Sequence, residues 1–285
     1  MQEVSPSQFS DFSAAVWQNY TEAGRKFPWR NTSDPYAIMV SEFMLQQTQT
    51  NRVLPKYVAW LDRFPSVQSV AESGLSDILS MWNGLGYNRR AKFLYESCCK
   101  ICAEWGGLLP RDSEMLDELP GVGPYTARAI STFAFNQAEI FIETNIRSAF
   151  IDFFFSGINS VSDADILPLI EITLDRVQPR EWYYALMDYG AVVKHRTENP
   201  SRRSASYTKQ SAFSGSLRQA RGAIIRQLSR NKSASLVEIS VAEHISMERL
   251  SAAVQKLAEE QLVCGQNDRY TFAELPKNKA ETERL

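Results

Sequence analysis

Apolar residues recur three and four positions apart along most of the 285-residue chain, and alternating apolar and polar runs are few. This spacing places apolar side chains on one face of a helix, so it predicts an all-α fold. The first predicted helix opens at Asp34-Pro35, an N-cap followed by proline, and runs through Gln47. Eight more are predicted before residue 194: Asn51–Phe64, Leu75–Trp82, Arg89–Trp105, Ser113–Glu118, Tyr125–Phe135, Asn145–Phe155, Ala164–Val177 and Arg180–Val193.

The pattern changes at residue 194. Residues 194–226 carry eight basic side chains and one acid, Glu198, and their centre is polar and rich in serine, which predicts an ordered loop or linker. Beyond it, the spacing predicts three short helices and a strand–turn–strand pair: Leu217–Ser229, Leu236–His244, Ser246–Gln261 and Leu262–Glu274. Three helices followed by a hairpin are typical of a winged helix.

Composition refines this prediction only slightly. The formal net charge is −2, so any surface that attracts nucleic acid must be local. No run of residues is apolar enough for a signal peptide or a membrane span, so we expect a cytoplasmic protein without membrane association. Cys98, Cys99 and Cys102 fall on one predicted helix, where core packing is favoured because a metal site there would lack a fourth nearby ligand.

The segment LPGVGPYTARAI, Leu119–Ile130, contains an unusually bare turn. Gly121 and Gly123 stand directly before a predicted helix, and prolines flank them. Glycine lets a backbone approach another molecule closely, and the N–H groups at a helix start point toward an anion. Two interpretations remain open: an ordinary turn between helices, or a turn that binds a phosphate of a nucleic acid.

Two carboxylates stand at the edges of apolar segments. Glu42 lies among apolar residues of the first predicted helix, where burial would favour its protonated form, a suitable acid for a leaving group. A solvated stripe with Ser41 and Gln46 is the alternative. Glu143 precedes the helix that begins near Asn145, so it would also suit the positive end of a helix dipole. Together, two such carboxylates suit a reaction that protonates a leaving group and stabilises a cationic sugar.

Aromatic and amide side chains at loop ends form another candidate group. Tyr87 follows Gly-Leu-Gly and stands beside Arg89 and Arg90, whereas Gln46 and Gln47 end the first predicted helix. Such side chains flanked by arginines are typical of wedges in an opened base stack. The alternative for Tyr87 is a surface tyrosine that covers the core.

Several motifs together resemble one family. FPWRNTSDPYAIMVSEFMLQQTQT, MWNGLGYNRRAK, LPGVGPYTARAI, ETNIR and ALMDYGA occur in the order and spacing of the helix-hairpin-helix (HhH-GPD) DNA glycosylases. The resemblance covers residues 27–213 and is strongest to the adenine-specific, MutY-type branch. It implies a two-lobed helical protein that binds DNA across a cleft and flips the target base into it.

The resemblance also implies roles for individual residues. Glu42 would protonate the departing purine and Glu143, with Asn145, would face the sugar. The other positions are implied to fill the opened stack (Gln47, Tyr87), to surround the adenine pocket (Trp29, Arg30, Tyr125) or to hold one DNA strand, often with a monovalent cation (Gly121, Gly123). Tyr125 stands where related lyases carry a Schiff-base lysine, so water would be the nucleophile and the enzyme monofunctional.

The sequence departs from that family at several positions. The sugar-facing carboxylate is glutamate instead of aspartate, and Tyr184 stands where the family has an amide or acid at the base edge. Four cluster cysteines are replaced by Lys194, Ser201, Ser204 and Gln210, so no iron–sulfur cluster is expected, and no other cofactor apart from the monovalent cation that the resemblance implies at the hairpin turn. The basic loop that replaces the cluster, with Arg202 and Arg203, is expected to contact phosphates, as are Arg89 and Arg90.

The family implies a division into parts. We expect one helical lobe from residues 1–27 and 139–213, a second from 28–138 with the hairpin, a winged-helix-like domain over 214–275 and a tail over 276–285. The third helix of the winged-helix-like domain has a net charge of −1, which favours a protein partner over base reading.

The expected function is that of a monomeric, nucleoid-associated DNA glycosylase of base excision repair. It would act on double-stranded DNA and remove adenine mispaired with 8-oxoguanine or guanine. One alternative is a glycosylase for thymine or uracil opposite guanine. The other is a non-catalytic protein that binds damaged or mismatched DNA.

Overall fold

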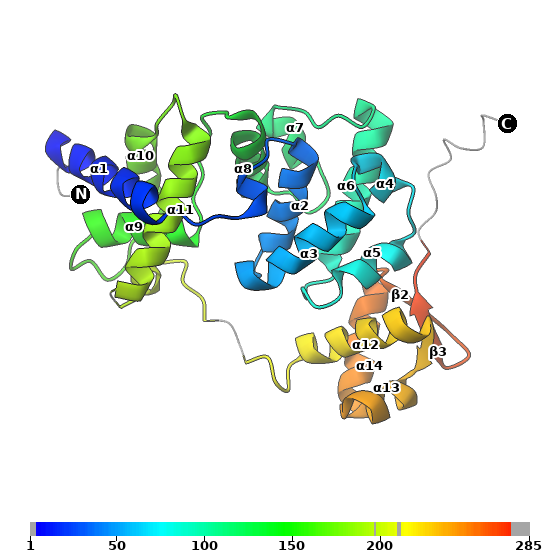
Figure 1. The fold of residues 1–285 in the computed structure, drawn as a ribbon. Helices are drawn as coiled ribbons and strands as arrows, with labels where there is room; N and C mark the ends of the chain where they lie inside the picture. The colour runs from blue at the N-terminus through cyan, green and yellow to red at the C-terminus, as the bar shows by residue number, and fades with distance from the viewer. Residues whose placement is uncertain (1–3, 197, 210–211, 275–285) are drawn as a thin grey trace. The chain divides into compact units, whose positions relative to one another are not determined.

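Helices dominate the computed structural model, which describes residues 4–196, 198–209 and 212–274 (Figure 1). The chain before the basic loop forms α1 (Pro6–Ala23), α2 (Pro35–Leu45), α3 (Thr50–Arg63), α4 (Val67–Ala71), α5 (Leu75–Trp82), α6 (Arg89–Trp105), α7 (Ser113–Asp117), α8 (Pro124–Phe135), α9 (Thr144–Phe154), α10 (Asp163–Thr173) and α11 (Pro179–Arg196). The all-α prediction is confirmed. Within the described ranges, no helix combines the length and apolarity that a membrane crossing needs.

Local signals explain where several helices begin. The carboxylate of Asp34 accepts hydrogen bonds from the backbone N–H groups of Tyr36 and Ala37, both at 3.2 Å, so it caps α2 as predicted. Sequence analysis missed α1, although Ser5 and Gln8 form a capping box at its start. It also missed α4, because five residues are too short for a helical period to be visible.

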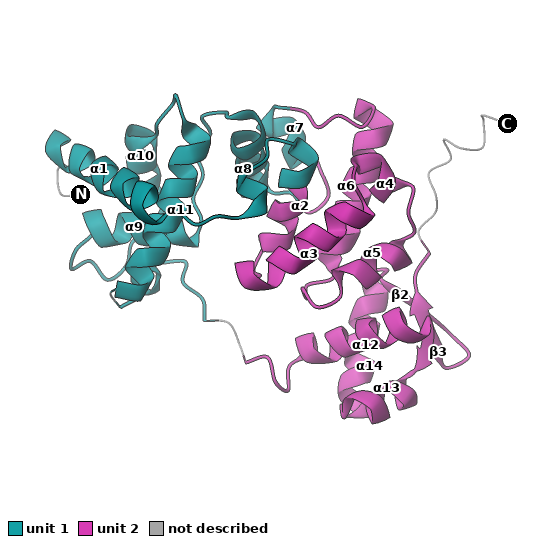
Figure 2. Ribbon diagram, viewed as in Figure 1, with its two compact units in different colours: residues 1–38, 111–117, 122–209 teal, residues 39–110, 118–121, 210–285 magenta. Residues whose placement is uncertain are grey.

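The chain divides into two compact units (Figure 2). Unit 1 comprises residues 1–38, 111–117 and 122–209, and its core lies among α1, α8, α9, α10 and α11. Aromatic side chains fill much of that core: the ring of Phe12 lies 4.8 Å from that of Phe150 and 6.3 Å from that of Trp182, centroid to centroid. Such pairs stabilise a core beyond the area that they bury.

Unit 2 comprises residues 39–110, 118–121 and 210–285. Its α3–α6 part is built around fully buried Trp60 and Trp82, whose rings meet edge to face at 5.8 Å. Cys98 on α6 is fully buried, as core packing predicts, and burial raises the pKa of its thiol well above the usual value; Cys99 and Cys102 are only half-buried. No group of three or more His, Cys, Asp or Glu side chains is placed to bind a metal ion in the described parts of the chain.

The C-terminal module of unit 2 contains α12 (Leu217–Asn231), α13 (Leu236–Glu243) and α14 (Met247–Glu259) with a small sheet. Strands β1 (Ser233–Ser235), β2 (Val263–Gln266) and β3 (Arg269–Phe272) pair antiparallel in the order β1-β3-β2. The β2–β3 turn uses Asn267 and Asp268, whose φ angles are 50° and 59°, as a tight hairpin requires. This order of helices and strands is that of a winged helix; sequence analysis missed only β1.

The two units do not follow the predicted lobes. The 28–138 lobe is split, since residues 28–38, 111–117 and 122–138 belong to unit 1 and the C-terminal module belongs to unit 2 with residues 39–110. These compact units do not test the division into two lobes and a winged-helix-like domain, which stays a prediction. The predicted tail, residues 276–285, lies outside the described residues.

Candidate active site

Glu42 is a buried carboxylic acid on α2. Its neighbours Met39, Val40 and Phe43 are fully buried, and only 8% of Glu42 is exposed. The alternative of a solvated stripe is wrong, because Ser41 is 1% exposed. A carboxyl group buried among apolar residues makes Glu42 a candidate for a functional role.

Glu143 is the N-cap of α9, and its carboxylate is fixed by three donors. Oε1 accepts from the backbone N–H groups of Asn145 and Ile146 at 2.7 and 2.9 Å, whereas Oε2 accepts from the side-chain amide of Asn145 at 3.2 Å. The expectation of helix-dipole stabilisation is thus met. These bonds also give the carboxylate one orientation, which a catalytic charge needs.

Arg30 sits at the centre of a rigid cluster in unit 1. Its guanidinium donates two hydrogen bonds to Asp188, at 2.8 and 2.9 Å, and lies over the ring of Tyr184 at 4.6 Å. Trp29 is buried and stacks on Phe27 with a centroid separation of 4.8 Å. These contacts hold the predicted pocket residues Trp29 and Arg30 in place.

Asp188, which sequence reasoning missed, anchors this cluster. It is 2% exposed and also accepts from the Arg25 side chain at 2.6 Å. Burial alone would raise the pKa of Asp188, but hydrogen bonds from Arg30 and the charges of Arg30 and Arg25 outweigh burial and lower it. An acid inside the otherwise apolar run ALMDYGA was the available signal.

Two aromatic residues predicted near the base differ in exposure. Tyr184 is 3% exposed and stacks on Phe133 at 4.7 Å, so its ring is part of the core. Tyr125 lies in the first turn of α8, is 36% exposed and packs edge to face on Phe141 at 5.6 Å. Of the two, Tyr125 is the one that another molecule can reach.

The two predicted wedge residues share an unusual backbone conformation. Gln47 and Tyr87 have φ angles of 53° and 48°, in the left-handed region that residues other than glycine rarely adopt. Both are exposed, Tyr87 by 37%. Strained, exposed residues of this kind are frequent at functional sites.

Arg90 braces the two loops that carry these wedges. Its guanidinium donates to the carbonyl oxygens of Phe43, Met44 and Gln46 at 2.8, 2.9 and 2.6 Å, and to that of Gly86 at 3.1 Å. It is buried, and burial lowers its pKa to about 10. The prediction of a phosphate contact is therefore wrong for Arg90, which caps the C-terminus of α2.

The other predicted phosphate ligands also divide into two kinds. Arg203 donates to the carbonyl oxygens of Phe155 and Ile158 at 2.6 and 3.3 Å, so it caps the end of α9 and does not fit a phosphate contact. Arg89 and Arg202 are exposed; Arg89 lies over Phe93, and Arg202 pairs with Glu198 at 3.3 Å. These two remain predicted phosphate ligands.

The hairpin glycines have different structural needs. Gly121 has a φ of +74°, and a Cβ there would lie 2.4 Å from the Phe93 side chain, so the fold requires glycine. Its carbonyl oxygen accepts from the Gln46 amide at 3.4 Å. A Cβ on Gly123 would meet nothing within 4 Å, so internal packing does not explain that glycine. Gly123 is also the N-cap of α8, which has no side-chain cap.

The positions that match cluster cysteines do not fit an iron–sulfur cluster. An ammonium group and two hydroxyl groups, from Lys194, Ser201 and Ser204, stand at the described positions, and none supplies the thiolate that such a cluster needs. Gln210 lies outside the described residues. Instead, Val161 and Ser204 form a parallel β-bridge that attaches the loop to unit 1.

Lys194 and Gly190 on α11 are further residues that sequence reasoning did not assign to the site. The Lys194 ammonium donates to Oδ1 of Asn145 at 2.8 Å. Burial lowers the pKa of Lys194, and the charge of Glu143 opposes this shift. A Cβ on Gly190 would lie 1.9 Å from the Asn145 carbonyl oxygen, so glycine is needed for the close approach of α11 to α9. A glycine inside a predicted helix was the available signal.

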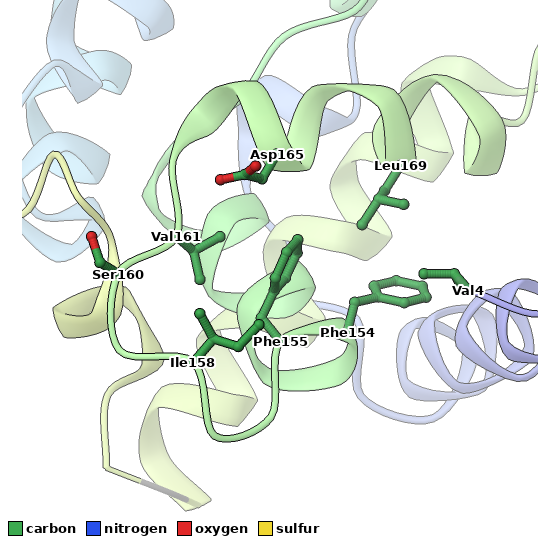
Figure 3. A pocket seen from close by; sticks show the side chains of 8 residues that line it. All are labelled: Val4, Phe154, Phe155, Ile158, Ser160, Val161, Asp165 and Leu169. Atoms are coloured by element: carbon green, nitrogen blue, oxygen red, sulfur yellow. The ribbon is translucent and has the colours of Figure 1, made fainter. Parts of the chain in front are cut away.

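A cavity of about 220 Å³ lies elsewhere in unit 1 (Figure 3). Its lining is mainly apolar and includes Phe154, Phe155, Ile158 and Leu169. None of the predicted site residues lines it. The cavity is therefore separate from the candidate catalytic residues.

Comparison with known proteins identifies the family. A family model described as HhH-GPD superfamily base excision DNA repair protein matches residues 40–262. The chain belongs to the HhH-GPD superfamily. The family resemblance seen in the sequence motifs is thereby confirmed.

Relatives of this superfamily member include proteins named adenine DNA glycosylase. That of Mycobacterium tuberculosis (strain CDC 1551 / Oshkosh) is 38% identical over 197 residues, which cover 67% of this chain and 63% of the relative. That of Homo sapiens is 33% identical over 199 residues, which cover 66% of this chain and 36% of the relative. The chain thus spans less than two thirds of the length of these relatives.

Solved structures support the superfamily fold. A thermostable thymine-DNA glycosylase aligns with a TM-score of 0.59 at 24% identity, over 65% of this chain and 87% of that chain. A non-covalent complex of endonuclease III with DNA aligns with a TM-score of 0.58 at 14% identity, over 70% of this chain and 98% of that chain.

In this superfamily member, the predicted site residues are divided between the two units. Unit 1 holds Glu143 with Asn145, and the group around Arg30, whereas unit 2 holds Glu42 and the two wedge loops. The meeting of Glu42 and Glu143 at one bond therefore belongs to the function proposed below.

Proposed function

We propose that this chain is a monofunctional DNA glycosylase of base excision repair. It hydrolyses the N-glycosidic bond of a flipped adenine that is mispaired with 8-oxoguanine or guanine in double-stranded DNA. The observation that carries the proposal is the buried carboxyl group of Glu42 among apolar residues of α2, in a chain similar to proteins named adenine DNA glycosylase.

Glu42 acts on the base side of the bond. Its carboxyl group is buried, and as the acid it donates a proton to a ring nitrogen of the purine. The electron pair of the breaking bond then moves onto a base that leaves in neutral form. Proton transfer of this kind contributes about a hundredfold or more in rate.

Glu143 acts on the sugar side. Loss of the base leaves positive charge on the sugar, and a fixed carboxylate stabilises that charge without having to reorient. The hydrogen bonds from the Asn145 and Ile146 backbone support this role, because they hold the carboxylate in one orientation before substrate binds.

Water is the nucleophile. Its oxygen bonds to the sugar carbon that the base has left, and its proton passes to a carboxylate, so atoms and charge balance. Tyr125 carries a phenol where related lyases carry an amine, and a phenol forms no imine. The reaction therefore ends at an abasic site without strand cleavage.

DNA recognition rests on the hairpin and the wedge loops. Gly123 leaves open space at the start of α8, where a phosphate would meet backbone N–H groups, and a monovalent cation would bind at the same turn. Gln47 and Tyr87 are exposed and held in left-handed conformations, which supports insertion into an opened base stack.

Single-turnover excision assays test the proposal. Duplexes with adenine opposite 8-oxoguanine, adenine opposite guanine, and thymine or uracil opposite guanine identify the base removed. Glu42→Gln should reduce excision by at least about a hundredfold and leave duplex affinity within about threefold. Asp62→Asn, which neutralises an exposed acid of unit 2, is the matched control and should keep full activity.

The same panel distinguishes the alternatives. Excision of thymine or uracil alone would assign the chain to another mismatch specificity. Tyr184, which was predicted at the edge of the base, is buried and stacked in the core, so it does not itself select adenine. Tight binding of mismatched duplexes without any excision would make the chain a DNA-binding protein and overturn the catalytic role of Glu42.

A further inference from the structure

A chain of hydrogen bonds connects α11 to the candidate sugar-facing carboxylate. Lys194 Nζ donates to Oδ1 of Asn145 at 2.8 Å, and Nδ2 of Asn145 donates to Oε2 of Glu143 at 3.2 Å. The backbone N–H of Asn145 donates to the other carboxylate oxygen, Oε1, at 2.7 Å. Both ends of the Asn145 amide are therefore occupied, each by a group of defined charge.

The chemistry of the three groups fixes the direction of this chain. An ammonium group only donates hydrogen bonds and an ionised carboxylate only accepts them, whereas a side-chain amide does both at opposite ends. With Lys194 present, only one orientation of the Asn145 amide satisfies both neighbours. If the amide turned over, its oxygen would face the Glu143 carboxylate and its NH₂ group would face the ammonium.

The backbone supports the same arrangement. Gly190 and Lys194 are four residues apart and lie on one face of α11. At Gly190 the two helices approach so closely that a Cβ would lie 1.9 Å from the Asn145 carbonyl oxygen. This approach brings α11 against the first turn of α9, within reach of a lysine side chain one turn further along.

We infer that Lys194 is a positioning residue, which acts through the Asn145 amide to hold Glu143 in its catalytic orientation. The inference rests on the proposed function, in which Glu143 stabilises charge on the sugar. A lysine at a position where related enzymes carry a cluster cysteine would thus support the active site through Asn145.

Kinetics on variants of the full chain test this inference. Lys194→Met keeps the length of the side chain and removes the donor, so the single-turnover rate on a duplex with adenine opposite 8-oxoguanine should fall about tenfold or more. Duplex affinity should change less than about threefold. Lys194→Arg, which retains charged donors, should recover part of the rate. Arg176→Met removes an exposed cation of the same unit and should leave rate and affinity unchanged.

A double-mutant cycle separates positioning from a general loss of charge. In an Asn145→Ala background, Lys194→Met should cause little further loss, because the amide through which it acts is already gone. A full additional loss in that background would overturn the inference. So would a Lys194→Met effect confined to duplex affinity, which would indicate a phosphate contact instead.

The outcomes also separate this inference from the proposed function. If the wild type excises no base from any duplex of the panel, both fail. If the wild type is active, Glu42→Gln is inactive and Lys194→Met is as fast as wild type, only the role of Lys194 fails. Thermal unfolding of each variant shows whether it folds. Should Lys194→Met not fold, the cycle is run with Lys194→Arg. The effects of Lys194→Arg and Asn145→Ala on the rate should then be non-additive, because both act on the same hydrogen bond.

Discussion

At the scale of the residue, the buried carboxylate of Asp188 is paired with two arginines and holds particular side chains in place. Asp188 accepts hydrogen bonds from Arg25 and Arg30, and Arg30 in turn lies over Tyr184. Removing one member of such a pair leaves a buried charge without compensation, which costs more than the pair itself contributes.

Replacing Asp188 therefore has a predictable effect on stability. Asp188→Asn should lower the free energy of unfolding by about 3 kcal/mol at neutral pH. Because the folded-state pKa of Asp188 lies below its usual value, this contribution is complete above about pH 5 and is lost as the pH falls through the folded pKa. Urea unfolding between about pH 3 and pH 7 should show that the free energies of unfolding of the wild type and Asp188→Asn converge in acid. A difference that does not change with pH would contradict the prediction.

Substitution of the two adjacent arginines on α6 should change stability by very different amounts. Arg90→Met leaves the carbonyl oxygens at the end of α2 without their donor and should cost about 3 kcal/mol of stability. Arg89→Ala removes an exposed side chain and should change stability by less than about 1 kcal/mol.

DNA binding completes this comparison. Arg89→Ala should weaken binding to all duplexes and reduce the slope of log affinity against log salt concentration by about one. Denaturant titration and fluorescence anisotropy at several salt concentrations measure both effects. If Arg90→Met were as stable as the wild type and had a smaller salt slope, Arg90 would contact a phosphate, as the sequence predicted, and its capping role would be wrong.

At the scale of the element, the contact between α9 and α11 depends on one glycine. Gly190→Ala forces the two helices apart, because its methyl group would lie 1.9 Å from the Asn145 carbonyl oxygen. The expected result is a loss of about 2 kcal/mol in stability and at least a tenfold slower excision.

A matched glycine on α12 serves as the control. A Cβ on Gly222 would meet nothing within 4 Å, so Gly222→Ala should stabilise its helix by about 0.5–1 kcal/mol. Thermal unfolding and single-turnover rates of both variants check these opposite signs. Equal effects would mean that helix propensity, and not the helix contact, governs Gly190.

At the scale of the whole molecule, the C-terminal module is integrated into unit 2. Lys92 on α6 donates to the carbonyl oxygen of Glu260 at 3.0 Å and to Oε1 of Gln261 at 2.9 Å. Arg218 on α12 donates to the hydroxyl group of Tyr87 at 3.1 Å, so the module also touches a wedge loop. Unit 2 should therefore unfold as one cooperative body.

Lys92→Met should loosen this attachment. Loss of two hydrogen bonds from a buried ammonium should cost about 2 kcal/mol and separate the unfolding of the module from that of α3–α6 in calorimetry. Lys100→Met, on the same helix, removes ion pairs with exposed Glu104 and Glu118 and a cation–π contact with Trp105, and should change stability by less than about 1 kcal/mol. An unchanged single transition for Lys92→Met would indicate that the remaining contacts, including the Arg218–Tyr87 hydrogen bond, hold the module without Lys92.

Local patterns in the sequence determined most of the helices and the superfamily. Three local signals can be identified without a structure, because each acts over only a few residues: apolar spacing, the Asp34 cap and the Asn267-Asp268 turn. The motif residues Glu42, Gln47 and Tyr87 were identifiable for the same reason, because each lies within a short distinctive stretch.

Tertiary structure alone decided which charged residues are buried and which contacts they make. Arg89 and Arg90 are adjacent and identical in type, yet only Arg90 is buried beneath the end of α2. Lys194 contacts Asn145, 49 residues earlier in the chain, because the fold places α11 beside the start of α9. Burial and pairing depend on segments far apart in the chain, and no periodicity within one segment carries that information.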